Sequence, residues 1–562
     1  MSILTHAPQF TPDDAVQFAH TLYNLPATAV PLPSERDQNF RLTTADGRQF
    51  VLKIANALED PAMLAAQQLA MTAVAQANGR APHIIPISDG QPYTAVHAAD
   101  GTAHHIWLIT HLPGVPLGRI PWHSPALLAD LGRALGDLDH ALANFDHPAL
   151  HRPFPWDLAN GLQTISAYLP QVTDPALHDL IAQFAADFAQ RTQPHLAALR
   201  RSAIHNDAND YNVLVTVNPA HAERPQQVSG IVDFGDMVHS VTIAELAVAC
   251  AYAVLDKPDP LAAAAAIVQG YHAAYPLPEQ ELDVLHDLIC LRLALSACMA
   301  AQQQQQRPDD PYLTISQQPI RHTLPRLLAT PPRLATAVYR HACQFPPVPT
   351  ALIITNWLRE NSMGFAPVLP LPLSTAHVLD LSVSSPLIHG DPQQNSATLL
   401  GQRLDAALAA TGAAVGVGQY DEARLIYTAP TFALGGGVMA PRRTIHLGLD
   451  LFAPAGTAVH APLPGHVHAC ADNADPQDYG PVIVLRHQTD DGRPFFTLYG
   501  HLSRQSLAGV QVGQAIAAGQ PFATLGIAAV NGGWPPHLHF QILADDLDLG
   551  ADFPGVGAAA QR

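Results

Sequence analysis

The stretch HNDANDYN, from His205 to Asn212, decides how the first half of this sequence is interpreted. The strand-like run VLV follows it at once, and Asp233 in IVDFGD then leaves the end of a further strand-like run. A phosphotransferase needs a group that orients the acceptor hydroxyl and oxygen ligands for the Mg²⁺ that accompanies the nucleotide phosphates. The spacing predicts that Asp207 orients the hydroxyl, and that Asn212 and Asp233 hold Mg²⁺.

Lys53 supplies the remaining requirement, a cation for the phosphate oxygens of ATP. It lies in FVLKIAN, in the second of two strand-like runs joined by an Asp-Gly turn, which is typical of a hairpin. The alternative is a polar loop that matches the spacing by chance. The segment HGDPQQN at 389–395 is such a match, since its asparagine comes one residue early and no IDFGD-like strand follows. It is predicted to be a turn, whereas Lys53, Asp207, Asn212 and Asp233 in order favour a catalytic loop.

This order of motifs resembles the aminoglycoside phosphotransferase and choline kinase superfamily, which has an α+β, two-lobed protein-kinase-like fold. The resemblance covers roughly residues 15–345 and implies ATP and Mg²⁺ as cofactors. Through DQNFRL, FVLKIAN, LPG and YLTISQQP the sequence is most similar to the hydroxylysine kinase branch. That branch implies a small-molecule substrate, an amino-alcohol or a hydroxy-amino acid.

The sequence also departs from the superfamily's pattern. LPSERDQNF precedes Lys53, where a G-x-G-x-x-G loop is absent. The helix expected after Lys53 offers Gln67 and Gln68 where kinases place a glutamate that holds the lysine, and Glu59 is the substitute that the sequence provides. The loop reads HND where HGD is usual.

A second constellation lies near the carboxyl end of the sequence. TIHLGLD contains His446 and Asp450 with a glycine between them, and FFTLYGHLS contains His501 just after a strand-like run. PPHLHF contains His537 and His539, which the alternation of a strand would place on one face. Two imidazoles and a carboxylate suit a catalytic Zn²⁺ with an open water position, and two further histidines could take a proton from that water.

These motifs look like the LytM-type, M23 family of metallopeptidases, which cut peptide cross-links in bacterial cell walls. The resemblance covers residues 435–545 and implies zinc as a cofactor and a peptide as a substrate. The positions that match the family's zinc ligands are His446, Asp450 and His539, and those that match its catalytic pair are His501 and His537.

The chain has 30 histidines, so most of them are structural or surface groups. GHVHA forms another H-x-H pair from His466 and His468, but it follows HLGLD too closely and precedes YGHL. That order does not fit the family, so both are predicted to be ordinary strand residues.

The fold class is therefore expected to be multidomain, with a kinase-like α+β part followed by a β-rich metallopeptidase-like domain. The segment GFAPVLPLPLS is rich in proline, as a linker would be. The closing GADFPGVGAAAQR resembles the junction at which longer proteins continue into a class III aminotransferase-like domain, so a fragment or shortened version is expected. The expected parts are an N-lobe at 15–115, a helical C-lobe at 116–345, a linker region at 346–434, the M23-like domain at 435–545 and a tail at 546–562.

Net charge, apolar segments and cysteine spacing indicate which partners and which cellular location to expect. The formal net charge is −19, from 47 acidic and 28 basic side chains, which disfavours nucleic acid and anionic membranes as partners. The amino terminus lacks a basic start and an apolar core, and windows such as LAVACAYAVL are too short to cross a bilayer. The 5 cysteines are scattered without a C-x-x-C pair. A cytoplasmic protein without a membrane span is predicted, and its oligomeric state stays open.

Three hypotheses follow for function. The first is ATP-dependent phosphorylation of a hydroxyl on a small amino-alcohol or hydroxy-amino acid. The second is zinc-dependent hydrolysis of a cell-wall-type peptide, with the kinase-like part as a nucleotide-binding or regulatory module. The third is a non-catalytic scaffold with vestigial sites, which the glutamines at the usual glutamate position and the missing export signal both favour.

Overall fold

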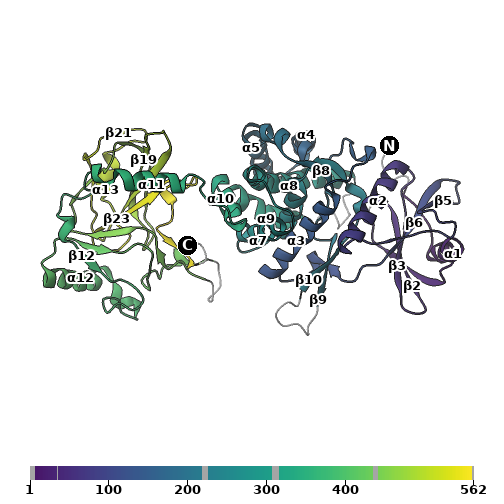
Figure 1. Cartoon of the computed structure of the whole chain (residues 1–562), viewed down its shortest axis with the longest axis horizontal. Helices are drawn as coiled ribbons and strands as arrows, with labels where there is room; N and C mark the ends of the chain where they lie inside the picture. Colours follow the sequence, from purple (N-terminus) through teal and green to yellow (C-terminus); the bar gives the residue numbers. More distant parts are fainter. Residues whose placement is uncertain (1–6, 35, 218–225, 307–315, 435–440, 560–562) are drawn as a thin grey trace. The chain divides into compact units, whose positions relative to one another are not determined.

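The computed structural model describes residues 7–34, 36–217, 226–306, 316–434 and 441–559. The chain divides into two compact units, Met1–Phe345 and Pro346–Arg562, drawn in purple to teal and in green to yellow in Figure 1. The first unit is α+β and the second is β-rich, as predicted.

The first unit begins with an antiparallel sheet in the order β1-β2-β3-β6-β4, with β5 also paired to β6. The strands are β1 (Ala27–Leu32), β2 (Gln38–Thr44), β3 (Gln49–Ile54), β4 (Ile84–Ile85), β5 (Thr94–His97) and β6 (Ala103–Thr110), and the helices are α1 (Pro12–Tyr23) and α2 (Pro61–Asn78). Strands β2 and β3 form the predicted hairpin, with Thr43 opposite Gln49. Gly47 takes the left-handed φ of +84° that this turn requires. Lys53 therefore lies on a strand in the middle of the sheet.

The rest of the first unit is mainly helical, as predicted. Its helices are α3 (Pro125–Leu142), α4 (Gly161–Tyr168), α5 (Pro175–Arg191), α6 (Ile243–Ala253), α7 (Pro260–Ala274), α8 (Glu279–Gln306), α9 (Gln317–Leu328) and α10 (Pro332–Ala342). Short strands pair in the orders β10-β9-β7 and β11-β8. They are β7 (Val115–Pro116), β8 (Arg201–Ile204), β9 (Val213–Val217), β10 (Gln226–Ile231) and β11 (Val238–Val241). The segment 205–212 connects β8 to β9.

Helix α8 runs through the core of this unit. By length and composition alone, its stretch Glu279–Gln305 could cross a membrane, but 94% of the apolar window is buried inside the structure. Leu288, Leu291 and Leu295 on this helix are fully buried. The apolar composition of α8 is thus explained by its packing within the first unit.

Helices α3 and α7 pack with their backbones in close approach. A Cβ atom added at Gly132 would lie 1.8 Å from the carbonyl oxygen of Ile267, and one added at Gly270 would lie 1.8 Å from that of Ala129. No side chain fits at either place, so glycine is required for this crossing. Helix α3 also contacts β10, the strand that ends just before Asp233.

The second unit is built on a sheet in the order β12-β13-β16-β23-β20-β19-β18-β21. These strands are β12 (His377–Leu379), β13 (Gly416–Gly418), β16 (Leu449–Phe452), β18 (Gly465–Asn473), β19 (Gly480–Gln488), β20 (Pro494–Gly500), β21 (Ala515–Ile516) and β23 (His537–Leu543). Smaller pairings join β14 (Glu422–Ala423), β15 (Ile445–His446) and β24 (Val556–Gly557), and join β17 (Ala458–His460) to β22 (Pro521–Thr524). Its α-helices are α11 (Ala351–Asn361), α12 (Ala397–Thr411) and α13 (Arg504–Ala508).

The structure differs from the expected linker at 346–434 and tail at 546–562. Strands β12 and β13 extend the sheet of the second unit, and β24 of the tail pairs with β15. These strands have two or three residues each, so they hold their conformation through pairing and not through a pattern of their own. The proline-rich composition was therefore a poor guide to the boundary.

The α3–α7 crossing gives a stability prediction. We expect Gly270→Ala to lower the free energy of unfolding of the first unit by about 1–3 kcal/mol, because the added methyl overlaps a backbone carbonyl. The matched control is Gly401→Ala on α12, where the added Cβ meets only a Pro535 side-chain atom at 3.8 Å. Scanning calorimetry of both variants checks this, and equal transitions in the two would contradict it.

Candidate functional sites

Asp207 is held by the loop that connects β8 to β9. Asn212 donates from Nδ2 to the carbonyl oxygen of Asp207 at 2.9 Å and to its Oδ2 at 2.8 Å. Nδ2 of Asn209 lies 3.1 Å from each carboxylate oxygen of Asp207. The Asp207 side chain is 22% exposed, so it is fixed in orientation yet reachable from solvent.

Asn206 explains why this loop reads HND. Its φ is +66°, a left-handed conformation that glycine adopts freely and that asparagine tolerates better than most residues. Its Nδ2 donates to the carbonyl oxygen of Asp236 at 3.2 Å, and its backbone N–H donates to Oε2 of Glu245 at 2.8 Å. Asparagine therefore keeps the turn and also ties the loop to the segment after Asp233.

Pairing of β9 with β10 brings Asn212 and Asp233 together. Asn212 directly precedes β9, Asp233 follows the end of β10, and the two strands are antiparallel. The backbone N–H of Val232 donates to the carbonyl oxygen of Asn212 at 2.9 Å. Because Nδ2 of Asn212 is directed to Asp207, its amide oxygen is the atom left for a ligand. An amide oxygen beside a carboxylate is a donor set that suits Mg²⁺.

Lys53, on β3, extends to the carboxylate of Asp233. Its Nζ lies 3.4 Å from Oδ1 of Asp233, across 180 residues of sequence. Burial lowers the pKa of Lys53, but the carboxylates of Asp233 and Asp37 outweigh burial and raise that pKa. The neighbouring ammonium of Lys53 in turn holds the pKa of Asp233 below its usual value. Both groups are therefore charged at neutral pH.

The partner of Lys53 is not Glu59, the substitute that the sequence provided. Among the ion pairs of the described residues, Lys53 pairs with Asp233. Glu59 lies in the turn before α2 and accepts a hydrogen bond from Nε2 of Gln67 at 3.3 Å. Burial raises the pKa of Glu59, which fits a carboxyl directed toward an amide and not toward the lysine.

Sequence reasoning missed Arg292, which reaches Asp207 from α8. Its Nη2 donates to Oδ1 of Asp207 at 2.9 Å, and its side chain is 2% exposed. The guanidinium carbon lies 4.5 Å from the ring centroid of Trp156 and 5.5 Å from that of Tyr252. The available signal was the single charge in the apolar run LICLRLALSAC, because a charge in a buried helix needs a partner.

A cavity of about 160 Å³ opens beside Asp207. Its lining includes the carboxyl groups of Asp210 and Asp236 and the ring of Trp156. Burial and the nearby Asp236 raise the pKa of Asp207 to about 7, against the opposing effect of Arg292. Burial also raises the pKa of Asp210 to about 6. A positively charged molecule in the cavity would favour the ionised forms of both carboxyl groups.

In the second unit, buried side chains of His446, Asp450 and His539 converge, each with a ligand atom within 4.8 Å of the others. Strands β16 and β23 pair with Asp450 opposite His539. Nε2 of His446 lies 3.0 Å from Nδ1 of His539 and 3.1 Å from Oδ1 of Asp450. A Cβ added at Gly448 would lie 2.5 Å from His539 Nε2, so the glycine in HLGLD leaves room for this ring.

The outer hydrogen bonds of both imidazoles fix which nitrogen carries the proton. Nδ1 of His446 donates to the carbonyl oxygen of Gln419 at 2.8 Å, and Nε2 of His539 donates to Oε1 of Gln541 at 3.2 Å. The unprotonated nitrogens of His446 and His539 therefore face each other and the carboxylate of Asp450. Three lone-pair donors at such distances fit a cation, and a metal-binding histidine usually has such an outer partner. This donor set fits zinc.

His501 and His537 lie next to the three converging donors. Their ring centroids are 4.2 Å apart, and Nε2 of His537 is 3.6 Å from Oδ1 of Asp450. Nδ1 of His501 donates to the carbonyl oxygen of Asn531 at 2.8 Å, and Nδ1 of His537 to that of Pro535 at 2.7 Å. Burial lowers the pKa of both, that of His501 well below its usual value. Both rings are thus neutral, with Nε2 available to accept a proton.

A further group that the sequence did not reveal is Arg424. Its side chain is 1% exposed, and it donates to Oδ2 of Asp450 at 2.6 Å and to Oε2 of Glu422 at 2.7 Å. Burial raises the pKa of Asp450, but His446 and Arg424 outweigh burial and hold that pKa well below its usual value. Arg424 thus keeps Asp450 ionised and leaves Oδ1 for the histidines.

A cavity of about 280 Å³ gives access to these side chains. Besides the histidines, its lining includes Tyr427, Phe432 and Trp534. Residues 381–432, from the region expected to be a linker, form part of this wall. The entrance to the site is therefore shaped by segments outside the stretch that carries the histidine motifs.

The two look-alike motifs behave as predicted. His389 is exposed and Asn395 ends a short 3-10 helix, and the backbone N–H of His389 donates to Oδ1 of Asn395 at 2.9 Å. His466 and His468 lie on β18, and Nε2 of His468 pairs with Asp546 at 2.8 Å. In the described part of the chain, neither pair joins the converging donors.

The chain matches the model of the phosphotransferase enzyme family over residues 28–282 and that of peptidase family M23 over residues 444–549. A hydroxylysine kinase of Danio rerio is 30% identical over 334 residues, which cover 57% of this chain and 93% of that protein. A hydroxylysine kinase of Xenopus laevis is 31% identical over 329 residues, which cover 55% and 87%. A solved structure of an amicoumacin kinase, in complex with AMP-PNP and Ca²⁺, is 15% identical with a TM-score of 0.44, over 60% of this chain and 96% of that one.

The resemblances to the phosphotransferase superfamily and to the M23 family are confirmed by these matches, whereas the resemblance of the closing segment to an aminotransferase junction stays a prediction. The chain belongs to the phosphotransferase enzyme family, and a peptidase family M23 domain follows its kinase-like fold.

Proposed function

We propose that this protein transfers the γ-phosphate of ATP to a hydroxyl of a small amino-alcohol or hydroxy-amino acid. The proposal rests on the way four side chains are brought together. Asn212 binds Asp207 within the loop that connects β8 to β9, the pairing of β9 with β10 places Asp233 beside Asn212, and Lys53 of β3 pairs with Asp233. The hydroxylysine kinases that are similar to the first unit support this substrate class.

Each of these side chains has a role that follows from its contacts. Asp207, held by Arg292 and Asn212, accepts a hydrogen bond from the acceptor hydroxyl and takes its proton as the new bond forms. Asn212 and Asp233 would hold Mg²⁺, which neutralises phosphate charge when bound. Lys53 would bind phosphate oxygens from the sheet side.

The cavity beside Asp207 supports an acceptor that carries an ammonium group. Asp210 and Asp236 line it, and Asp236 is ion-paired with Arg36, so Asp210 is the carboxylate that would meet a cation there. A carboxylate and an aromatic ring such as that of Trp156 both attract a small cation. This favours amino-alcohols over neutral sugars.

Phosphorus NMR of the full-length protein with ATP, Mg²⁺ and a panel of amino-alcohols, hydroxy-amino acids and aminoglycosides tests this function. We expect a new phosphomonoester signal, slowed about 10²–10⁴-fold in Asp207→Asn because the proton acceptor is lost. The matched control is Asp391→Asn, in the look-alike HGD turn, which should leave the rate unchanged. Intact ATP across the panel, in folded protein, would contradict the proposal.

We propose zinc-dependent hydrolysis of a peptide or related amide as a second activity, located in the other unit. The convergence of unprotonated nitrogens of His446 and His539 on the Asp450 carboxylate favours it. Zinc, when bound, polarises a carbonyl and lowers the pKa of water. His501 and His537, both neutral, would accept a proton at Nε2 and donate it to the leaving amine.

Metal content tests the donor set independently of activity. We expect His446→Ala to lose one bound zinc per chain, because two donors remain and they bind zinc far more weakly. His468→Ala is the matched control, since its ring pairs with Asp546 on β18. Elemental analysis after dialysis against trace zinc gives the stoichiometry, and equal zinc content in both variants would contradict the assignment.

A further inference from the structure

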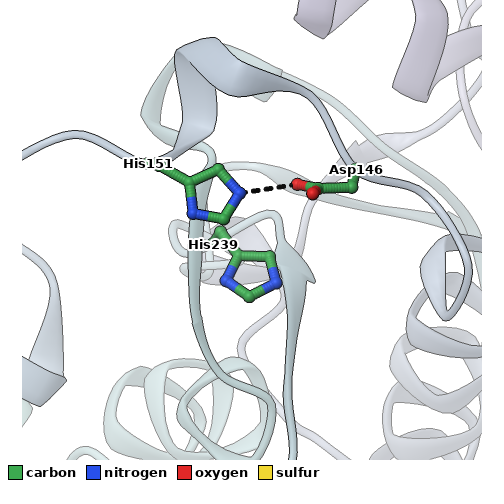
Figure 2. A group of neighbouring side chains, drawn as sticks. All are labelled: Asp146, His151 and His239. Atoms are coloured by element: carbon green, nitrogen blue, oxygen red, sulfur yellow. Dashed lines mark hydrogen bonds and ion pairs between the residues drawn. The ribbon is translucent and has the colours of Figure 1, made fainter.

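A second group of metal-type donors lies in the first unit, away from Lys53 and Asp233. Asp146 and His151 come from the connection between α3 and α4, and His239 comes from β11. Figure 2 shows the two imidazole rings lying one over the other, with the Asp146 carboxylate beside the His151 ring. Among the described residues, this group and His446–Asp450–His539 are those whose three ligand atoms all lie within 4.8 Å of one another.

The geometry brings these groups within reach of one ion. Nε2 of His151 lies 2.8 Å from Oδ1 of Asp146, and the ring centroids of His151 and His239 are 4.4 Å apart at an interplanar angle of 21°. His239 is fixed by its strand, since β11 pairs with β8 and His239 lies opposite Ala203. Asp146 and His151 are exposed, so their side chains can rotate to close around an ion without repacking the core.

The donor set selects the class of ion. Two imidazoles and one carboxylate suit zinc, cobalt or nickel, whereas Mg²⁺ and Ca²⁺ prefer a set of oxygens.

We propose that Asp146, His151 and His239 form a binding site for a divalent transition-metal ion. An ion bound there would join the α3–α4 connection to β11 across 88 residues of sequence. Arg152, next to His151, already makes a parallel link, since its Nη2 donates to the carbonyl oxygens of Gly235 at 3.0 Å and Met237 at 3.2 Å. Those residues follow Asp233, so the ion would stabilise the segment that carries the phosphate-site carboxylate.

Co²⁺ titration of the full-length protein tests this site. The starting variant is His446→Ala, which disables the donors of the second unit, and excess Mg²⁺ is present to fill oxygen-rich sites. We expect one Co²⁺ per chain by isothermal calorimetry with d–d absorption from nitrogen ligands. We also expect a rise in the unfolding temperature of the first unit, because the ion binds the folded state.

Substitution of each donor then identifies the ligands. His239→Ala and Asp146→Asn should each weaken Co²⁺ binding by at least about tenfold and abolish the rise in unfolding temperature. Asp146 is exposed, so its variant keeps the test valid if His239→Ala fails to fold. The matched control is His178→Ala, which removes an exposed histidine 3.1 Å from Asp179 that belongs to neither three-donor group. Binding that is absent, or equally weakened in the control, would overturn the proposal.

Discussion

The buried ion pair between Arg292 and Asp207 is the constraint on which the phosphotransfer site depends. Arg292 lies on the core helix α8 with a side chain that is 2% exposed, so its permanent charge needs a compensating partner, and Asp207 is that partner. The pair fixes one carboxylate oxygen toward the core, while Asn212 binds the other. The orientation of the loop between β8 and β9 is therefore set by a helix that begins more than 60 residues later. Asn206, left-handed and bonded to Glu245, completes the turn.

In the second unit the buried charge that needs a partner is a carboxylate, that of Asp450, and the partner is an arginine. Burial favours the neutral form of Asp450, but His446 and Arg424, which binds its Oδ2 at 2.6 Å, together favour the ionised form. Outer partners, Gln419 and Gln541, then direct the unprotonated nitrogens of the two rings inward. In both units a buried arginine positions the acid that the proposed chemistry needs. Both arginines lie outside the motifs that the sequence made visible.

The fold class, the β2–β3 hairpin and the family of each part could be predicted from the sequence, because motif spacing and turn residues are local signals. The pairing of Arg292 with Asp207 and of Arg424 with Asp450 could not, since these residues are 85 and 26 positions apart and no local pattern marks either pairing. The β12 and β13 strands were missed because each has only three residues and holds its conformation through sheet pairing, which no local pattern marks. Glu59 was offered as a partner for Lys53 because Gln67 and Gln68 stand at the usual glutamate position, whereas in the structure Lys53 pairs with Asp233. Local sequence patterns thus identified the candidate reactive side chains, whereas the residues that orient them, such as Arg292 and Arg424, depend on tertiary packing.

A double-mutant cycle on phosphotransfer tests the central claim, that Arg292 acts by positioning Asp207. The turnover rates of Asp207→Asn, Arg292→Met and the double variant would be compared, with calorimetry to verify folding. We expect Arg292→Met to lower kcat about tenfold or more while KM for ATP changes little, and we expect the double variant to be no slower than Asp207→Asn alone. If the losses instead multiply in the double variant, Arg292 acts independently of Asp207 and does not work by positioning it.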